Sequence, residues 1–322
     1  MMRLGMLRLT LIKPYGKAIC HAGKGQGAVL LKKIFLCLLL SWTIFLSVSQ
    51  AEAREIADMT GRLVVVPDRI SRVFATSPPG TYLLYAIDPS VIAGLNFPLW
   101  ENEKKYTVKR LQNLPVIGGV VGQGRSINQE VLLSVRPDLI IIWSWKDTAL
   151  NKQYEDIFTR LRIPWVNISL DSIEQYPDAL SFMGTLLNKE ERGQRLARYA
   201  KESLREVKAV VDKIPRQERL RVYYAEGPDG LATEGEGSVH AELIPMAGGI
   251  NVHRGNSPDR YGMEKVSLEQ VMAYNPDVIL VKERLFLDAI FKDPRWKNIK
   301  AVKERRVYFI PYQPFNWFDR PP

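Results

Sequence analysis

The sequence predicts an α/β protein built from two lobes that one long α-helix joins. Three observations lead to this fold class. Short apolar runs alternate with helical patterns along most of the chain, which is typical of parallel sheets covered by helices. Segments 127–142 and 266–281 repeat one pattern, in which an acidic helix start is followed by Pro-Asp and an apolar run. A long helical pattern at 189–213 separates the two copies.

The first 53 residues are interpreted as an N-terminal extension followed by a secretory signal peptide. Two lysines precede an uncharged apolar run at 34–48, and the small-x-small sequence 51–53 follows it. We therefore expect cleavage after Ala53. An uncleaved anchor is the alternative, although the run is shorter than the ~20 apolar residues that a membrane span needs. Lipid attachment at Cys37 is disfavoured because bulky residues, rather than small ones, precede it.

Removal of residues 1–53 changes the composition of the mature chain. The segment holds seven Lys and Arg residues and one Glu, so the net charge falls from +10 to +4. A small positive charge without a basic run gives no indication of a nucleic acid partner. Both cysteines, Cys20 and Cys37, lie in this segment. The mature chain therefore has no disulfide and depends on packing for its stability.

The first lobe is predicted to span residues 54–187. Four apolar runs are predicted strands, at 69–77, 90–95, 137–143 and 162–169. The third run is almost entirely apolar, as expected for a strand that is buried on both faces. Helices are predicted between these strands, at 81–86 and 151–161.

The predicted joining helix spans residues 188–214. Between 189 and 213 the apolar positions follow three- and four-residue steps, and Pro215 ends the pattern. The β–α alternation then resumes in the second lobe, residues 215–322. Strands are predicted there at 221–226, 276–281 and 306–311, with a helix before the second of them.

The repeated segments carry Glu130 and Glu269, which are 139 residues apart. Asn128 and Ser267 precede them as predicted N-caps, which places both glutamates in a first helical turn. An acidic residue there stabilises a helix against its macrodipole. That effect explains either glutamate alone, but it does not explain the same offset in both copies.

Taken together, the signal peptide, the segments 69–87, 116–142 and 266–281 and the long helix resemble the periplasmic binding proteins of ABC importers for iron-siderophores, cobalamin, haem and related metal complexes. The resemblance implies two Rossmann-like lobes joined by one long α-helix, with a ligand cleft between the lobes. It also implies that Glu130 and Glu269 dock on arginines of an inner-membrane permease, which an ATPase serves. Family members continue with a closing helix, so we expect the chain to be truncated after Pro322.

Aromatic residues gather at the expected carboxyl ends of the strands, where ligands bind in open parallel sheets. A broad apolar face of this kind suits a flat or bulky ligand. The ligand-binding candidates are the aromatic residues Tyr82, Trp100, Trp143, Trp145, Tyr224 and Trp317. Loop cations that would neutralise an anionic chelate are Arg125, Lys146, Arg254 and Arg260. Core packing is the alternative for each aromatic residue, and solvated loop charge is the alternative for each cation.

Motifs for nucleotide or zinc chemistry are missing from the sequence. The glycines at 118–124 do not form G-x-G-x-x-G. Only two histidines, His240 and His253, lie beyond the signal peptide, whereas a zinc site needs three or four clustered ligands. We assign His240 at most one bond to a metal that a chelator already carries, and we expect its loss to weaken binding only modestly. Gly235 and Gly237 allow either a close approach to a ligand or a simple turn.

We therefore expect a monomeric periplasmic solute-binding protein that captures a metal complex and delivers it to an ABC permease. It would need no intrinsic cofactor. An iron-siderophore is the first expectation for the cargo, and cobalamin, haem, a nickel chelate, molybdate and tungstate are the alternatives. A secreted α/β enzyme is the alternative of another class, disfavoured because G-x-S-x-G and a cysteine are missing and histidines are few. A third alternative is a structural or sensor protein that binds cargo but never docks on a permease.

Overall fold

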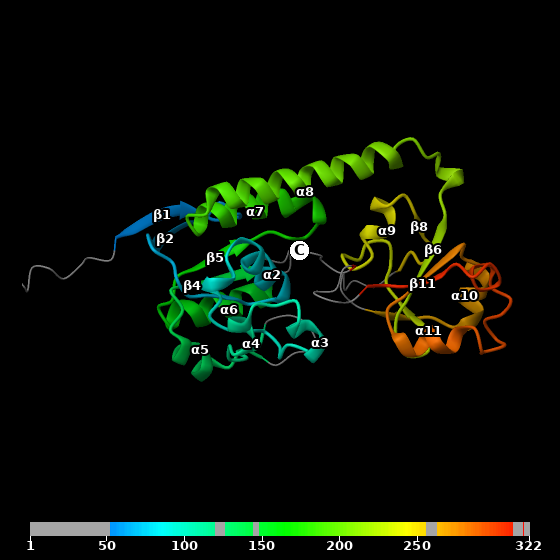
Figure 1. Cartoon of the computed structure of the whole chain (residues 1–322), viewed down its shortest axis with the longest axis horizontal. Helices are drawn as coiled ribbons and strands as arrows, with labels where there is room; N and C mark the ends of the chain where they lie inside the picture. Colours follow the sequence, from blue (N-terminus) through cyan, green and yellow to red (C-terminus); the bar gives the residue numbers. More distant parts are fainter. Residues whose placement is uncertain (1–51, 120–125, 144–147, 256–262, 312–317, 319–322) are drawn as a thin grey trace, which may run out of the picture. The chain divides into compact units, whose positions relative to one another are not determined.

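Two parallel β-sheets, one before and one after a long helix in the sequence, form the framework of the structure (Figure 1). The computed structural model describes residues 52–119, 126–143, 148–255, 263–311 and 318. The predicted signal peptide therefore lies outside the described residues, except for its last two positions. No helix within the described ranges is long and apolar enough to cross a membrane.

The elements before the long helix form a hairpin, a three-stranded sheet and the helices that pack on it. Their bounds are β1 (Ala53–Ala57), β2 (Leu63–Pro67), β3 (Val73–Ala75), α2 (Pro78–Ile87), η1 (Pro89–Val91), α3 (Glu101–Lys104), α4 (Lys109–Gln112), α5 (Gln129–Val135), β4 (Leu139–Trp143), α6 (Thr148–Arg160), β5 (Trp165–Ile168), η2 (Ile173–Gln175) and α7 (Tyr176–Leu186). Strands β1 and β2 pair antiparallel, and the sheet has the parallel order β3-β4-β5.

Strand β4 is buried along its whole length, as its apolar sequence predicts. Its side chains alternate between two cores because successive residues of a strand point to opposite faces. Leu139, Ile141 and Trp143 join one core, whereas Ile140 and Ile142 join the other. Both faces of this sheet are therefore covered, as in other parallel sheets.

The prediction of a strand at 90–95 is wrong. The segment begins with η1 and then makes only isolated bridges, between Val73 and Ile92 and between Leu95 and Val116. Local chemistry favours the helical start, because the Asp88 carboxylate accepts a hydrogen bond from the Ser90 N–H at 2.9 Å. Pro89 fixes the backbone φ at the first helical position. The remaining residues make single bridges to two different partners, so no ladder forms.

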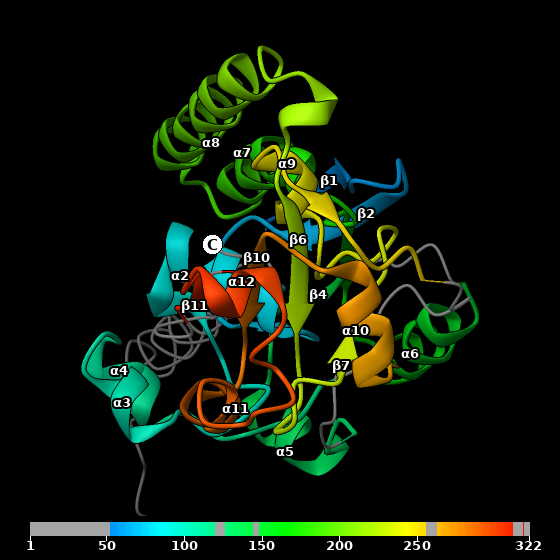
Figure 2. The ribbon, with the colours of Figure 1, turned by 90° about the vertical axis from the view of Figure 1, so that its right-hand side faces the viewer.

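The predicted joining helix is confirmed as α8 (Glu190–Val211), which has 22 residues. It packs beside α7, as Figures 1 and 2 both show, and the two backbones approach closely at a pair of glycines. A Cβ atom placed on Gly193 would lie 2.7 Å from the Cα of Gly184. Only glycine at both positions allows this approach.

The elements after α8 form a four-stranded parallel sheet (Figure 2). Their bounds are η3 (Arg216–Glu218), β6 (Arg221–Ala225), β7 (Ala232–Thr233), α9 (Leu243–Met246), β8 (Ile250–Asn251), β9 (Glu264–Lys265), α10 (Leu268–Tyr274), β10 (Val278–Val281), α11 (Arg284–Ile290), α12 (Lys300–Lys303) and β11 (Val307–Phe309). The sheet order is β11-β10-β6-β8, and β7 pairs with β9 in a separate antiparallel ribbon. The predicted strands at 221–226, 276–281 and 306–311 correspond to β6, β10 and β11.

The sequence repeat corresponds to a repeated structural unit, α5-β4 and α10-β10. Asn128 caps α5 by accepting from the Val131 N–H at 3.1 Å, and Ser267 caps α10 by accepting from the Gln270 N–H at 3.2 Å. Both predicted N-caps are therefore confirmed. Each helix ends at a residue in the left-handed region, Arg136 or Asn275, and the strand follows three residues later.

Candidate functional site

A pocket of about 630 Å³ lies beside α2 in the first half of the protein. Helix α2 and the loop that leads into α3 form its wall. We call it the aromatic pocket because four aromatic residues line it, namely Tyr82, Tyr85, Phe97 and Trp100. The structure thus brings together Tyr82 and Trp100, two of the candidates taken from the sequence.

The floor of the aromatic pocket is held by the buried side chain of Asn96. Its Nδ2 donates to the carbonyl of Ala75 at 2.9 Å and to that of Gly118 at 3.1 Å. Its Oδ1 accepts from the Thr81 hydroxyl at 2.8 Å. Through these bonds Asn96 connects the end of β3, helix α2 and the loop that contains Gly118. The pocket is therefore held at the carboxyl end of the sheet.

Trp100 forms the rim of the pocket and is 66% exposed. Its backbone N–H donates to the buried Glu103 carboxylate at 2.8 Å. The short helix α3, which carries Glu103, therefore holds the Trp100 backbone from which the indole extends. The Tyr85 hydroxyl donates to the Tyr106 carbonyl at 3.2 Å and accepts from the Val108 N–H at 3.3 Å. An exposed indole on an anchored backbone is a suitable contact for a flat ligand.

Other aromatic candidates lie in the protein core. Trp143 is 4% exposed and belongs to the core on one face of the first sheet. Tyr224 is 1% exposed, and its ring centroid lies 4.9 Å from that of Phe318.

Among the loop cations expected to contact the ligand, Arg254 is exposed. The candidates Arg125, Trp145, Lys146, Arg260 and Trp317 lie outside the described residues.

His240 lies in the loop after β7 and contacts a carboxylate. Its Nδ1 is 2.8 Å from Glu234 Oε1, and the Ser238 hydroxyl donates to the other oxygen of the same carboxylate. The Glu234 side chain is 2% exposed, whereas that of His240 is 23% exposed. Burial opposes ionisation of Glu234, but the His240 contact and the Ser238 hydroxyl outweigh it and hold the Glu234 pKa below its usual value.

A second buried carboxylate, Glu226, lies near Glu234 at the end of β6. Lys282 Nζ contacts its Oε1 at 2.6 Å, and the Glu226 side chain is fully buried. Burial raises the pKa of Glu226, and the charge of Glu234 adds to this effect while Lys282 opposes it. We call Glu226, Glu234, His240 and Lys282 the acid–histidine cluster. It places ionisable groups at the carboxyl end of the second sheet.

The loop from Glu234 to Glu242 differs from the sequence expectation in two respects. The close approach at Gly235 is to protein backbone, because a Cβ there would lie 2.8 Å from Gly255 Cα, whereas a Cβ on Gly237 would meet no atom of the described residues within 4 Å. In the sequence, Glu242 is the acidic residue nearest to His240 and thus its possible partner. That carboxylate instead accepts from the Ser172 hydroxyl at 2.6 Å and from the Ile173 N–H at 3.1 Å.

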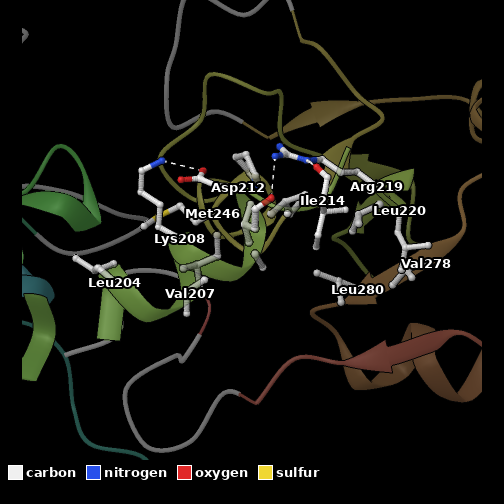
Figure 3. Close-up of a pocket in the computed structure, with 18 of the residues that line it drawn as sticks. Leu204, Val207, Lys208, Asp212, Ile214, Arg219, Leu220, Met246, Val278 and Leu280 are labelled. Carbon is white, nitrogen blue, oxygen red and sulfur yellow. Dashed lines mark hydrogen bonds and ion pairs between the residues drawn. The ribbon is translucent and has the colours of Figure 1, made fainter. Parts of the chain in front are cut away.

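A larger pocket of about 990 Å³ is an apolar groove beside α8 (Figure 3). Figure 3 shows Leu204 and Val207 of α8 on one side and Val278 and Leu280 of β10 on the other. An ion pair of 2.9 Å between Lys208 and Asp212 lies at its edge. The groove runs along a sheet face rather than at the carboxyl ends of the strands, where ligands bind in parallel sheets, so the aromatic pocket is the stronger candidate for a ligand site.

The model of the family described as "Periplasmic binding protein" matches residues 83–314, which is more than half of the chain. The chain belongs to the periplasmic binding protein family. Its relatives named below are binding proteins rather than enzymes.

Three members of the periplasmic binding protein family illustrate the similarity. The solved structure of an ABC transporter solute binding protein from Sulfurospirillum deleyianum is 36% identical, with 84% of each chain covered and a TM-score of 0.78. The molybdate-binding protein MolA of Haemophilus influenzae is 28% identical over 89% of this chain and 85% of its own. The Fe(3+)-citrate-binding protein YfmC of Bacillus subtilis is 26% identical over 65% of this chain and 64% of its own. The two-lobed α/β fold with a joining helix is thereby confirmed.

The sequence reasoning did not identify Tyr85, Phe97 or Glu234 as site residues. Tyr85 lies three residues after Tyr82, so both fall on one helical face, and that spacing was a usable signal. Phe97 lies two residues after the expected strand at 90–95. Glu234 carried no signal, because its pairing with His240 depends on the turn at Ser238.

Proposed function

We propose that this periplasmic protein binds a chelated metal complex, with a ferric siderophore or ferric citrate as the preferred cargo, and delivers it to an ABC permease. The aromatic pocket is the observation that carries this proposal. A chelate presents flat apolar or ring surfaces, which stack on aromatic side chains. A bare oxyanion, by contrast, needs a small site rich in hydrogen-bond donors, with little use for an exposed indole.

The family relationship supports the transport part of the proposal, and the Fe(3+)-citrate-binding relative supports the cargo class. We propose the lobes 54–187 and 215–322, joined by 188–214, with the cargo bound where the strands of both lobes end. Glu130 and Glu269 are the proposed docking residues, because both are exposed in the first turns of equivalent helices. A single helix between the lobes favours a small adjustment on binding over a wide hinge closure.

Molybdate is the second candidate cargo. The observation that favours it is the 28% identity to the molybdate-binding protein MolA over 89% of the chain. A tetrahedral oxyanion would rely on backbone N–H groups and cationic side chains, rather than on the aromatic pocket.

A ligand titration separates the two candidates. Protein purified from the periplasm is titrated with ferric citrate, a ferric tris-catecholate, a ferric hydroxamate and sodium molybdate, and tryptophan fluorescence is recorded. We expect quenching by at least one ferric complex, because Trp100 lines the pocket. A response to molybdate, with none to any ferric complex, would overturn the first candidate and support the second.

A further inference from the structure

We propose that Leu133 and Met272 are apolar anchors for the permease, one on each copy of the repeated helix, and that they hold the complex once it has formed. The inference rests on the proposed function, since its partner is the ABC permease to which the cargo is delivered. It adds two residues that the docking proposal does not contain. It also gives them a role that differs from that of Glu130 and Glu269.

Leu133 and Met272 are exposed apolar side chains at equivalent positions of α5 and α10. Leu133 is 48% exposed and Met272 is 44% exposed. They are 139 residues apart, which is the offset of the sequence repeat. Among the exposed large apolar side chains of the described residues, no other pair has this separation. Single exposed apolar residues are ordinary at protein surfaces, but that does not explain the same exposure at the same position of both copies.

Each apolar side chain lies on the same helical face as the glutamate of its copy. Leu133 follows Glu130 by three residues, and Met272 follows Glu269 by three residues. This spacing makes two side chains neighbours on the surface of a helix. Both glutamates are exposed as well. Each copy therefore presents a carboxylate beside an apolar group, which suits a partner that offers a cation beside an apolar pocket.

A small residue completes this face in each copy. Ser134 and Ala273 come directly after the two anchors, and both are exposed. The Ser134 hydroxyl donates to the Val131 carbonyl at 2.7 Å, so its hydrogen bond is made within its own helix. Small side chains beside an anchor leave space for a partner to surround it, and apolar anchors bind best in such fully desolvated pockets.

The buried side of the two helices is equivalent too. Leu132 and Val271 are both completely buried, and they belong to the separate cores of the first and the second sheet. After them, each helix ends at a left-handed residue and leads into its strand through Pro-Asp. The carboxylate and the apolar group thus take the same place on both helix–strand units. A partner with two equivalent halves, as in a two-fold symmetric permease, can contact both.

Helix propensity does not explain why leucine and methionine stand at these positions. Gln, Glu, Lys and Arg favour helices about as strongly, and they are better solvated on an exposed face. An apolar side chain contributes only when a partner covers it, and covering one strengthens binding about 10-fold or more. Exposed charges act mainly on the rate of association, whereas buried contacts act mainly on the rate of dissociation. The glutamates and the anchors therefore have different kinetic signatures.

The test measures binding of the full protein to the ABC permease and its ATPase, purified from the same organism and held in lipid nanodiscs. We expect Leu133→Gln and Met272→Gln each to raise the dissociation rate about 10-fold. The double variant should raise it about 100-fold, because the two helices pack on different cores and independent effects add. The association rate and its salt dependence should stay at their wild-type values. The variant Glu130→Gln, Glu269→Gln should instead slow association at low salt and weaken its salt dependence.

Two further variants serve as controls. Leu285 is an exposed leucine of α11, which has seven residues like α5 and α10 but lies outside the repeat, so Leu285→Gln should leave both rates unchanged. The exchange Leu133→Met with Met272→Leu keeps both apolar groups and should retain the wild-type rates. Melting temperature and cargo affinity should equal those of wild type in every variant, because the altered side chains are exposed.

The outcomes distinguish this inference from the proposed function. A wild-type dissociation rate in the double glutamine variant of the anchors, with slower association of the glutamate variant, would overturn the anchors and leave delivery to the permease standing. Equal binding of wild type to nanodiscs without permease would assign the apolar groups to a lipid surface, and a dimer that the anchor variant loses would assign them to a second copy. Either result would overturn the inference. Failure of the cargo-loaded wild type to bind the permease would overturn delivery and the inference together.

Discussion

Asp277 and Arg221 form a reciprocal pair of hydrogen bonds across the start of two parallel strands. The Asp277 N–H donates to the Arg221 carbonyl at 2.8 Å, and the Asp277 carboxylate accepts from the Arg221 N–H at 2.8 Å. The pair comes directly before the ladder in which Val278 of β10 lies opposite Val222 of β6. It therefore fixes the register of the two strands from their first residues.

The same arrangement recurs in the first sheet. The Asp138 N–H donates to the Arg72 carbonyl at 2.7 Å, and its carboxylate accepts from the Arg72 N–H at 2.9 Å and from the Ser71 hydroxyl at 2.9 Å. Val73 of β3 then pairs with Leu139 of β4. The repeated aspartate of the sequence is thus explained by strand registration, independently of any docking role for the preceding glutamates.

Replacement of Asp138 should destabilise the protein. In Asp138→Ala the Ser71 and Arg72 N–H groups lose a charged acceptor, so we expect the free energy of unfolding to fall by about 1–3 kcal/mol. Urea unfolding monitored by circular dichroism measures the change. Asp212→Ala is the control, because that carboxylate is exposed and forms its ion pair with Lys208, one turn earlier in the chain. Such exposed pairs contribute little to stability. Equal stability of the two variants would contradict this account.

The Asp277 contacts predict a pH dependence of stability. Burial opposes ionisation of this carboxyl group, but Lys300 at 2.6 Å and the Arg221 N–H hold its pKa below the usual value. Because the pKa of Asp277 is lower in the folded state than in the unfolded state, where it is about 4, ionised Asp277 stabilises the protein above that pH. This stabilisation is lost as the pH falls through the folded-state pKa. Asp277→Asn should therefore differ from wild type more at pH 7 than near pH 3. Urea midpoints at both pH values give the comparison, and a constant difference would refute it.

The glycine contact between α7 and α8 predicts a loss of stability in Gly193→Ala. Alanine is intrinsically better in a helix by about 1 kcal/mol. Here its Cβ would lie 2.7 Å from Gly184 Cα and 2.8 Å from the Leu180 carbonyl oxygen, both backbone atoms. Overpacking of this kind costs about 1–3 kcal/mol, so we expect a lower melting temperature. Gly237→Ala, where no atom of the described residues lies within 4 Å of the new Cβ, should melt close to wild type.

The proposed docking role predicts a transport defect without a binding defect. The double variant Glu130→Lys, Glu269→Lys should retain its fold and its cargo affinity, because both side chains are exposed. Uptake of cargo by cells should be abolished, since like charges across an interface prevent productive encounter. Each single variant should reduce uptake partially.

Helix α8 offers the control for that variant. Glu190 is also an exposed glutamate in a first helical turn, so Glu190→Lys reproduces the loss of helix-start stabilisation away from the repeat. Its uptake should equal that of wild type. Normal uptake in the double variant, together with a small drop in melting temperature, would mean that Glu130 and Glu269 serve only their helices.

Trp100 is expected to contribute directly to cargo affinity. Trp100→Ala should weaken binding of the ferric complex about 3–10-fold, as expected for one lost aromatic contact, and should remove much of the fluorescence quenching. Tyr199→Ala removes an aromatic side chain that is exposed on α8 and should have no effect on either measurement. Unchanged quenching in Trp100→Ala would mean that another tryptophan responds to the cargo. The binding surface would then lie outside the aromatic pocket.

The sequence by itself determined the fold class, the long helix and the two helix–strand units of the repeat. These features depend on local chemistry: the three- and four-residue apolar steps of α8, the capping side chains of Asn128 and Ser267, and the uninterrupted apolar run of β4. Each of them acts within a few residues, so the order of residues is sufficient to predict it.

Only the tertiary structure decided the contacts that connect distant residues. The segment at 90–95 is apolar enough for a strand, but its neighbours offer it only single bridges. The contact of Gly184 with Gly193 depends on how α7 and α8 cross, and the partner of His240 depends on the path of the loop after β7. Composition and spacing do not record these paths, because loop conformation and packing arise from the whole chain at once.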